Sequence, residues 1–210
     1  MLDYEKLKNA VVDLDEDTVF EEIDAVMAAG GSEANTAMAA CQEGLDGVGV
    51  LFAEGTYFIG DLIFAGELMT EVVTKMRSAL VQGGDSGNQG RMILATVAGD
   101  LHDIGKNIVR AFLEASGFEV LDLGIDVPSA KIVDTAVAED IHIIALSGVL
   151  TLAIDSMREV VDILKERGLK DDYKVIIGGN PVSAEICQAI GADAWAHAPQ
   201  DTVTACKSWL

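Results

Sequence analysis

Hydrophobic residues recur with helical spacing through the first part of the chain. This part contains no proline, and its periodicity predicts four helices, at about Tyr4 to Leu14, Asp17 to Ala29, Glu33 to Ala53 and Tyr57 to Leu80. Four amphipathic helices predict a small bundle, because each helix needs neighbours to cover its apolar face.

Short local signals mark the ends of the second of these helices. Acidic residues from Asp15 to Asp17 stand at its start, where negative charge interacts favourably with the helix dipole. Gly30 and Gly31 follow its end, where a left-handed cap is expected. Ser32 is then the expected N-cap of the third helix.

After residue 90 the pattern changes to short apolar runs that alternate with helical segments. The predicted strands are Met92 to Val97, Glu119 to Leu123, Ile141 to Leu146, Lys174 to Ile177 and a short one near Ala194. The predicted helices are Ile104 to Ala115, Ser129 to Glu139, Ala153 to Arg167, Ser183 to Ile190 and a last one from about Thr202. Five such βα units predict a flavodoxin-like (Rossmann-type) parallel sheet with the strand order 2-1-3-4-5.

A glycine-rich segment separates the two patterns. Residues 82–90 read QGGDSGNQG and contain almost nothing apolar, which is typical of a linker. The predicted organisation is therefore a helical bundle at 1–81, a linker at 82–90 and an α/β domain at 91–210.

Composition and charge exclude several classes of protein. Of the 210 residues 50% are hydrophobic, which suffices for one or two domains with buried cores. The formal net charge of −21 argues against nucleic acid or an anionic membrane as a partner. The chain has no apolar run of about 18 residues and no signal-peptide pattern at its start, so a cytoplasmic protein is expected.

Unusual residues gather after three of the predicted strands. The first strand runs into the segment from Gly99 to Gly105, the third into Ser147 to Thr151, and the fourth into Gly178 to Pro181. These strands are neighbours in the predicted order, and ligands bind beyond their carboxyl ends at the point where the order reverses. The three loops are therefore expected to meet at one crevice.

Two residues of the first loop carry candidate chemistry. His102 is expected to face the crevice, where an imidazole can bind a metal or move a proton. Asp100 lies two residues earlier and can accept the other ring N–H, which fixes the tautomer. Gly105 allows a bulky planar group to approach the backbone, and Gly178 with Gly179 opens room beside the fourth strand.

Structural explanations stand beside this interpretation. Glycines are common after strands, and Asp100 or Asp103 can cap the helix that follows. A zinc site is disfavoured because His142 starts the third strand, at the opposite edge, and His197 has no Cys or further His beside it. The widely spaced Cys41, Cys187 and Cys206 predict free buried thiols.

A phosphorylated receiver domain has the same predicted architecture. Its pattern is not met, because the third strand ends in Leu146 and Ser147 without an acceptor aspartate. The lysine expected after a later strand is also missing, since the fourth strand ends in glycines.

The three loops together resemble a known signature. Asp100-x-His102-x-x-Gly105, 41 residues, Ser147-x-Val149, 28 residues and Gly178-Gly179 are similar to the cobalamin-binding pattern D-x-H-x-x-G, S-x-L, G-G. This pattern belongs to the corrinoid proteins of methyltransferase systems and to cobalamin-dependent methionine synthase. Val149 stands where the family has leucine.

The helical part shares the resemblance. Residues 55–69 are similar to the family's helical cap, with Gly60 at the place of the usual proline. The two parts together cover essentially the whole chain, which therefore resembles a stand-alone corrinoid protein.

This resemblance implies roles for individual residues. His102 would be the lower axial ligand of the cobalt in place of the cofactor's own benzimidazole, Asp100 would hydrogen-bond His102, and Ser147 would bond the displaced base. Phe58 and Leu62 would lie over the upper face, and backbone at 196–198 would close the far end of the nucleotide tail. The remaining implied cofactor-binding residues are Asp103, Ile104, Gly105, Val149, Leu150, Thr151, Gly178 and Gly179.

The resemblance also implies a function. The protein would carry a methyl group on cobalamin, accepting it on Co(I) from a methylated donor through one methyltransferase and passing it to a second one. The implied donors are methylamines, betaine, methanol or methoxyaromatics, the acceptor is a pterin or a thiol, and the loaded form is methylcobalamin. A reductive activase is a further implied partner, and the protein itself would be a non-catalytic subunit.

Two other classes share the cofactor. A cobalamin-dependent sensor usually carries an additional DNA-binding module, which is not expected in this acidic chain. The small subunit of a carbon-skeleton mutase has the binding domain without the helical cap, and uses adenosylcobalamin.

Overall fold

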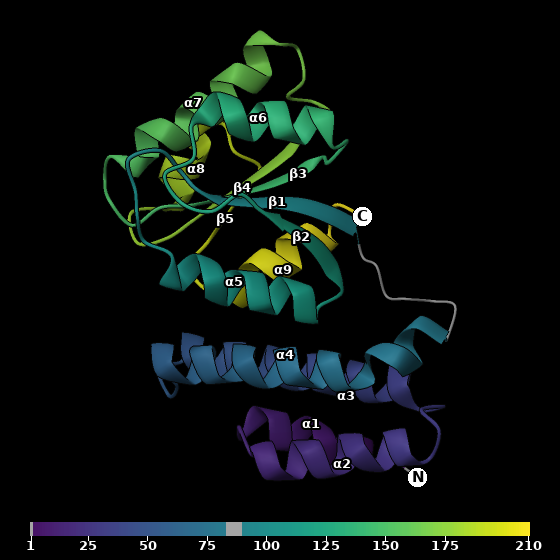
Figure 1. Cartoon of the computed structure of the whole chain (residues 1–210). Helices are drawn as coiled ribbons and strands as arrows, with labels where there is room; N and C mark the ends of the chain where they lie inside the picture. Colours follow the sequence, from purple (N-terminus) through teal and green to yellow (C-terminus); the bar gives the residue numbers. More distant parts are fainter. Residues whose placement is uncertain (1, 83–89) are drawn as a thin grey trace. The chain divides into compact units, whose positions relative to one another are not determined.

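The structure is a computed structural model that describes residues 2–82 and 90–210 (Figure 1). The predicted linker at 82–90 lies outside the described residues except for its first and last positions. The chain forms two compact units, one built mainly before residue 89 and one mainly after it. No helix in the described ranges is long and apolar enough to cross a membrane.

The first unit contains the predicted helices. They are α1 (Tyr4–Val12), α2 (Glu16–Ala28), α3 (Ala34–Ala53) and α4 (Ile59–Gln82). Gly44 and Gly47 let α1 approach α3 closely, because a Cβ at these positions would lie 2.6 Å from Val11 Cβ and 2.7 Å from a methyl group of Val12. The four-helix prediction is confirmed.

The ends of α2 follow the local signals. The Asp15 side chain accepts a hydrogen bond from the Thr18 N–H at 3.2 Å, which caps the helix. Gly30 and Gly31 have φ values of +92° and +74°, and the Gly31 N–H donates to the Val26 carbonyl. This bond between the sixth and first residues of the turn is that of a Schellman cap.

The prediction for Ser32 is wrong. The N-cap of α3 is Glu33, and no side chain caps this helix. The Ala34 N–H donates to the Gly31 carbonyl, so the turn extends one residue further before the helix begins. The Glu33 carboxylate instead accepts the Leu2 N–H at 3.1 Å.

The second unit is a five-stranded parallel sheet with the order β2-β1-β3-β4-β5, as predicted. Its strands are β1 (Gly90–Thr96), β2 (Phe118–Asp122), β3 (Ile143–Ser147), β4 (Lys174–Gly178) and β5 (Ala194–Ala196). Its helices are α5 (Ile104–Ala115), α6 (Ser129–Ala138), α7 (Ala153–Glu166), α8 (Ala184–Ile190) and α9 (Pro199–Lys207). Figure 1 shows α5 and α9 on one face of the sheet and α6, α7 and α8 on the other.

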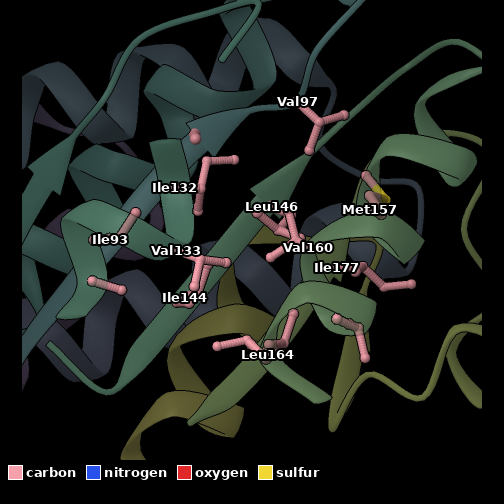
Figure 2. Packing of buried hydrophobic residues seen from close by; sticks show 14 of the residues in the cluster. Ile93, Val97, Ile132, Val133, Ile144, Leu146, Met157, Val160, Leu164 and Ile177 are labelled. Atoms are coloured by element: carbon pink, nitrogen blue, oxygen red, sulfur yellow. The ribbon is translucent and has the colours of Figure 1, made fainter. Parts of the chain in front are cut away.

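The sheet carries apolar side chains that are buried against these helices. On the face covered by α6 and α7, Ile144 and Leu146 of β3 belong to one cluster with Ile132 of α6 and Val160 of α7 (Figure 2). Because helices cover both faces, the central strands are continuous apolar runs. The same burial fixes the register, and with it the place where each strand ends.

The last helix begins earlier than predicted, at Pro199 instead of about Thr202. Proline at the first helical position supplies a φ angle suited to a helix and lacks an N–H that would be unpaired there. The Asp201 carboxylate also accepts the Ala198 N–H at 3.1 Å, which stabilises this start.

A buried ion pair joins α5 to β2. The Lys106 side chain is 3% exposed, and its Nζ lies 2.5 Å from Asp122 Oδ2. The other Asp122 oxygen accepts the Gly124 N–H at 2.9 Å. The beginning of α5 is thereby held against the end of β2.

Candidate functional site

The loops that follow β1, β3 and β4 start from one edge of the sheet. Thr96, Ser147 and Gly178 are lateral partners in the register of these strands. Parallel strands end at the same edge, so the three loops leave the sheet side by side. The sequence prediction that these loops meet is confirmed.

A buried carboxylate organises this edge. Asp100 is 0% exposed, and its Oδ1 accepts the backbone N–H of His102 at 3.0 Å and lies 2.6 Å from His102 Nδ1. Its Oδ2 accepts the N–H groups of Val149 at 2.7 Å and Leu150 at 2.9 Å. The bond to His102 was predicted, whereas no sequence signal indicated the two bonds to the β3 loop. Asp100 therefore ties the β1 loop to the β3 loop.

The surroundings of Asp100 determine its ionisation. Burial by itself raises the pKa of this carboxyl group, but the hydrogen bonds from Leu150, His102 and Val149 outweigh burial and lower the pKa well below its usual value. Asp100 is thus a carboxylate at neutral pH and can only accept hydrogen bonds. The proton between the two side chains consequently belongs to His102 Nδ1.

This arrangement leaves the other ring nitrogen available. The His102 side chain is 53% exposed, and its Nε2 makes no hydrogen bond with any described residue. With Nδ1 protonated, Nε2 carries a lone pair that can coordinate a metal.

The low pKa of Asp100 predicts a dependence of stability on pH. We expect Asp100→Asn to lower the free energy of unfolding of the apoprotein at pH 7 by about 1–3 kcal/mol, because an amide replaces a carboxylate that accepts four hydrogen bonds. A carboxyl group whose pKa is lower in the folded than in the unfolded protein stabilises the folded state. Its full contribution is present above the unfolded-state pKa of about 3.9, and it is lost as the pH falls through the folded-state pKa. The difference between variant and wild type should therefore shrink below about pH 4, as measured by urea unfolding from pH 7 to pH 3.

Asp103→Asn is the matched control. The Asp103 side chain is exposed and makes no hydrogen bond with the described residues, so its replacement should change stability little at any pH. A difference for Asp100→Asn that did not vary with pH would contradict the role given to its carboxylate.

The alternative that Asp100 caps α5 is wrong, because both of its oxygens are engaged elsewhere. Asp103 gains no support as a cap either, since none of the described residues donates to its side chain. Its backbone carbonyl accepts the Asn107 N–H at 2.8 Å.

The glycines of the signature differ in what they do. A Cβ on Gly105 would meet nothing within 4 Å, so no neighbouring atom of the chain requires glycine there. A Cβ on Gly179 would lie 1.9 Å from the Gly148 carbonyl oxygen, and its φ of +119° also disfavours other residues. Gly179 thus brings the β4 loop against the β3 loop, a role the sequence analysis did not predict.

Exposed apolar side chains occur in the loops that leave this edge of the sheet. They come from the loops after β1, β2 and β3 and from the start of α5. The residues are Leu101, Ile104, Ile125, Val149, Leu150 and Leu152. Of these, Ile104, Val149 and Leu150 were predicted, and the others were missed although apolar residues in loops at a sheet edge are themselves a signal. Such a surface suits a large apolar ligand.

Two predicted hydroxyl groups remain available. Ser147 is half-buried at the end of β3, where its carbonyl accepts the Val97 N–H at 3.1 Å. Its hydroxyl, like that of the exposed Thr151, makes no hydrogen bond within the part of the chain that the structure describes.

The other two histidines make contacts of their own. His142 precedes β3, where its ring stacks on Tyr173 and its nitrogens contact Asp140 and the Asp172 carbonyl. His197 contacts Trp195 edge-to-face. Within residues 2–82 and 90–210, no three His, Cys, Asp or Glu side chains are grouped to hold a metal ion.

The three cysteines are free and buried, as predicted. Burial raises the pKa of Cys41 and of Cys206 to about 12, so both thiols stay protonated at neutral pH.

The two predicted residues of the helical unit differ in exposure. Phe58 is 70% exposed, and Val50, Ile59 and Ile63 are exposed near it in the sequence. Leu62 is only 2% exposed and belongs to the buried side chains. Of this pair, only the Phe58 side chain is accessible to a ligand without repacking of the helical unit. The exposed side chains of Ile59 and Ile63 were not predicted from the sequence.

Comparison with known proteins identifies the family. A family model of the B12 binding domain matches residues 90–206, and a second model with the same description matches residues 4–76. The chain belongs to the B12-binding corrinoid proteins. The resemblance seen in the three-part signature is confirmed, as is cobalamin as the cofactor.

Relatives cover both units of this corrinoid protein. A cobalamin-binding protein from Desulfitobacterium hafniense DCB-2 is 49% identical, and the similarity covers 100% of both chains with a TM-score of 0.91. Dimethylamine corrinoid protein 1 from Methanosarcina acetivorans is 38% identical over 80% of this chain and 78% of the relative. The methanol:cobalamin methyltransferase complex from Methanosarcina barkeri is 26% identical, covering 98% of this chain and 78% of that chain, with a TM-score of 0.76.

The site of this corrinoid protein fits its cofactor. The available Nε2 suits coordination of cobalt, the apolar rim suits the faces of a corrin ring, and the hydroxyl of Ser147 is available to a polar group. The open space at Gly105 is a further observation, because no neighbouring atom of the chain explains a glycine in the first turn of α5.

Gly105 therefore allows a test that separates folding from binding. We expect Gly105→Ala to leave the apoprotein as stable as the wild type or to stabilise it by up to about 1 kcal/mol, while weakening cobalamin binding. Urea unfolding and titration with cobalamin measure the two effects. Unchanged binding would show that the bare backbone at Gly105 does not face the cofactor.

Proposed function

We propose that this corrinoid protein is a methyl carrier. It holds the cobalamin to which a donor-specific methyltransferase transfers a methyl group from a methylated amine, betaine, methanol or a methoxyaromatic compound. A second methyltransferase then transfers the group to a pterin or a thiol, and a reductive activase restores inactive cofactor. The observation that carries this proposal is the half-exposed His102, whose Nδ1 is held by the buried Asp100.

The chain's own residues bind and position the cofactor in this proposal. Bound cobalamin supplies a cobalt centre that can accept and release a methyl group. His102 Nε2 would coordinate the cobalt of bound cobalamin, and Asp100 would fix the ring tautomer and make the imidazole a stronger ligand.

Ser147 would donate its available hydroxyl hydrogen to the displaced base of the cofactor, and Thr151 would line the nucleotide tail. Gly178 and Gly179, with backbone at 196–198, border the same tail.

The helical unit contributes an apolar cover. Phe58, Ile59 and Ile63 stand exposed at the start of α4, and Val50 is exposed near the end of α3. We propose that this surface covers the upper face of the corrin and excludes water from the reacting cobalt. A cover of this kind must move aside for each methyltransferase.

The relatives support the proposed partners. One is named as a dimethylamine corrinoid protein, and another is part of a methanol:cobalamin methyltransferase complex. This chain supplies no catalytic group of its own in the proposal, and the methyltransferases perform both transfers.

The test supplies the cobalamin-loaded, reduced protein with candidate donor-specific methyltransferases and a panel of isotopically labelled donors. One donor of the panel should place its labelled methyl group on the protein-bound cofactor, and a second methyltransferase with a pterin or thiol should remove it. Retention of adenosylcobalamin together with a radical-forming partner would refute the carrier function in favour of a mutase subunit.

A further inference from the structure

The backbone of the loop that carries His102 is held by side chains from three elements. Ser156 of α7 donates its hydroxyl hydrogen to the Ala98 carbonyl at 2.9 Å. Asp126, after β2, accepts the Gly99 N–H at 2.7 Å. Thr96, the last residue of β1, donates its hydroxyl hydrogen to the His102 carbonyl at 3.0 Å. The signature itself contains none of these three residues.

Asp126 makes the most extensive of these contacts. In addition to its carboxylate bond, its own N–H donates to the Asp100 carbonyl at 3.1 Å. Its φ is +51°, a left-handed conformation that non-glycine residues seldom adopt. Glycine would adopt this conformation more easily, but it has no oxygen to accept the Gly99 N–H. The chain therefore retains an aspartate where backbone conformation alone favours glycine.

Thr96 acts from the opposite end of the loop. Its side chain is fully buried, so its hydroxyl needs a partner, and the His102 carbonyl supplies it. Asp126 and Thr96 thus bracket the segment from Gly99 to His102, while the Asp100 carboxylate holds it from within.

We propose that Asp126 and Thr96 are positioning residues that place the Asp100–His102 pair for coordination of cobalt. The inference rests on the proposed function of His102 as the metal ligand. Without these bonds, the Asp100 carboxylate and the imidazole remain in the chain, but the loop backbone can shift by more than coordination tolerates. Supporting groups of this kind commonly change metal affinity 10–100-fold.

Three substitutions at Asp126 separate conformation from hydrogen bonding. Asp126→Gly keeps the left-handed backbone and removes the acceptor, Asp126→Asn keeps both, and Asp126→Ala loses both. The Asp126→Gly variant should bind cobalamin roughly 10–100-fold more weakly than the wild type. It should also lose nitrogen coupling in a fraction of the Co(II) electron paramagnetic resonance signal. Asp126→Asn should keep the wild-type cobalamin affinity and nitrogen coupling. Asp126→Ala should bind cobalamin at least as weakly as Asp126→Gly.

Thr96 provides a second, independent pair. Thr96→Val keeps the buried shape without the hydroxyl and should weaken binding, whereas Thr96→Ser keeps the hydroxyl and should bind nearly as the wild type does. If Asp126→Gly fails to fold, the comparison of Thr96→Val with Thr96→Ser still tests the proposed positioning role.

A measurement without cofactor separates this inference from the proposed function. In the apoprotein, ¹⁵N NMR of the His102 ring should show Nδ1 protonated in the wild type, and a larger share of the other tautomer in Asp126→Gly and Thr96→Val. Wild-type tautomer and affinity in both variants would overturn the positioning role. An absence of nitrogen coupling in the cobalamin-loaded wild type would instead overturn the proposed function of His102.

Discussion

His102→Ala is expected to abolish the nitrogen coupling in the Co(II) electron paramagnetic resonance spectrum of the cobalamin-loaded protein. The His102 ring is half-exposed, and its Nε2 is the nitrogen left available when Asp100 holds Nδ1. Alanine removes this nitrogen without disturbing the core, because the imidazole is not part of it. Cobalamin affinity should fall by at least 10–100-fold, since loss of a metal ligand should cost no less than loss of its supporting group.

His142→Ala is the matched control for this experiment. His142 also pairs with an aspartate two residues earlier, but it lies at the amino end of β3. Its replacement should leave both the nitrogen coupling and the cobalamin affinity as in the wild type. Coupling that persists in His102→Ala, or benzimidazole still attached to the metal in the wild type, would refute the assignment of His102.

Gly179→Ala is expected to destabilise the apoprotein by about 3 kcal/mol or more. The new Cβ would lie 1.9 Å from the Gly148 oxygen and 2.8 Å from its carbonyl carbon, both of them backbone atoms that cannot rotate away. Overpacking costs about 1–3 kcal/mol, and a side chain at this φ adds about 1–3 kcal/mol. A melting temperature lower by roughly 10 °C should accompany the change. Thermal and urea unfolding measure both effects.

The neighbouring glycine is the control. A Cβ on Gly178 would meet only the Ala196 carbonyl oxygen, at an ordinary 3.5 Å. Gly178→Ala should therefore cost the apoprotein far less stability than Gly179→Ala. Equal destabilisation would mean that the contact of Gly179 with Gly148 does not limit the packing of these loops.

Most of the fold could be predicted from the sequence, because helical and strand periodicities are local. The range of α5 was predicted as Ile104 to Ala115, and the structure has the same helix. Strand bounds and helix ends differ by one to two residues, as for β1, which runs from Gly90 to Thr96 instead of from Met92 to Val97, and two helix starts were also wrong. Ser32 failed as a cap because the preceding glycine turn extends to Ala34, and α9 begins at Pro199 because Asp201 folds back on the Ala198 N–H. Both helix starts depend on which nearby oxygen accepts a hydrogen bond from a backbone N–H.

The candidate site was predicted in part. The spacing of Asp100 and His102 sufficed to predict their hydrogen bond, since the residues are two positions apart. The exposed Leu101, Ile125 and Leu152 were missed because solvent exposure depends on how the loops leave the sheet. The family resemblance implied that Leu62 lies over the upper face of the cofactor, whereas its side chain is buried in the helical unit.

The sequence by itself determined the kinds of elements, because helical and strand periodicities are local, and its βα pattern and family resemblance predicted the order of the strands and the residues proposed to carry chemistry. Only the tertiary structure decided which groups hold those residues in place. Asp100 accepts N–H groups from 49 and 50 positions away, and Gly179 meets the backbone of Gly148. Such contacts arise because parallel strands bring distant loops to one edge, and their geometry depends on distances between backbones that no local pattern encodes.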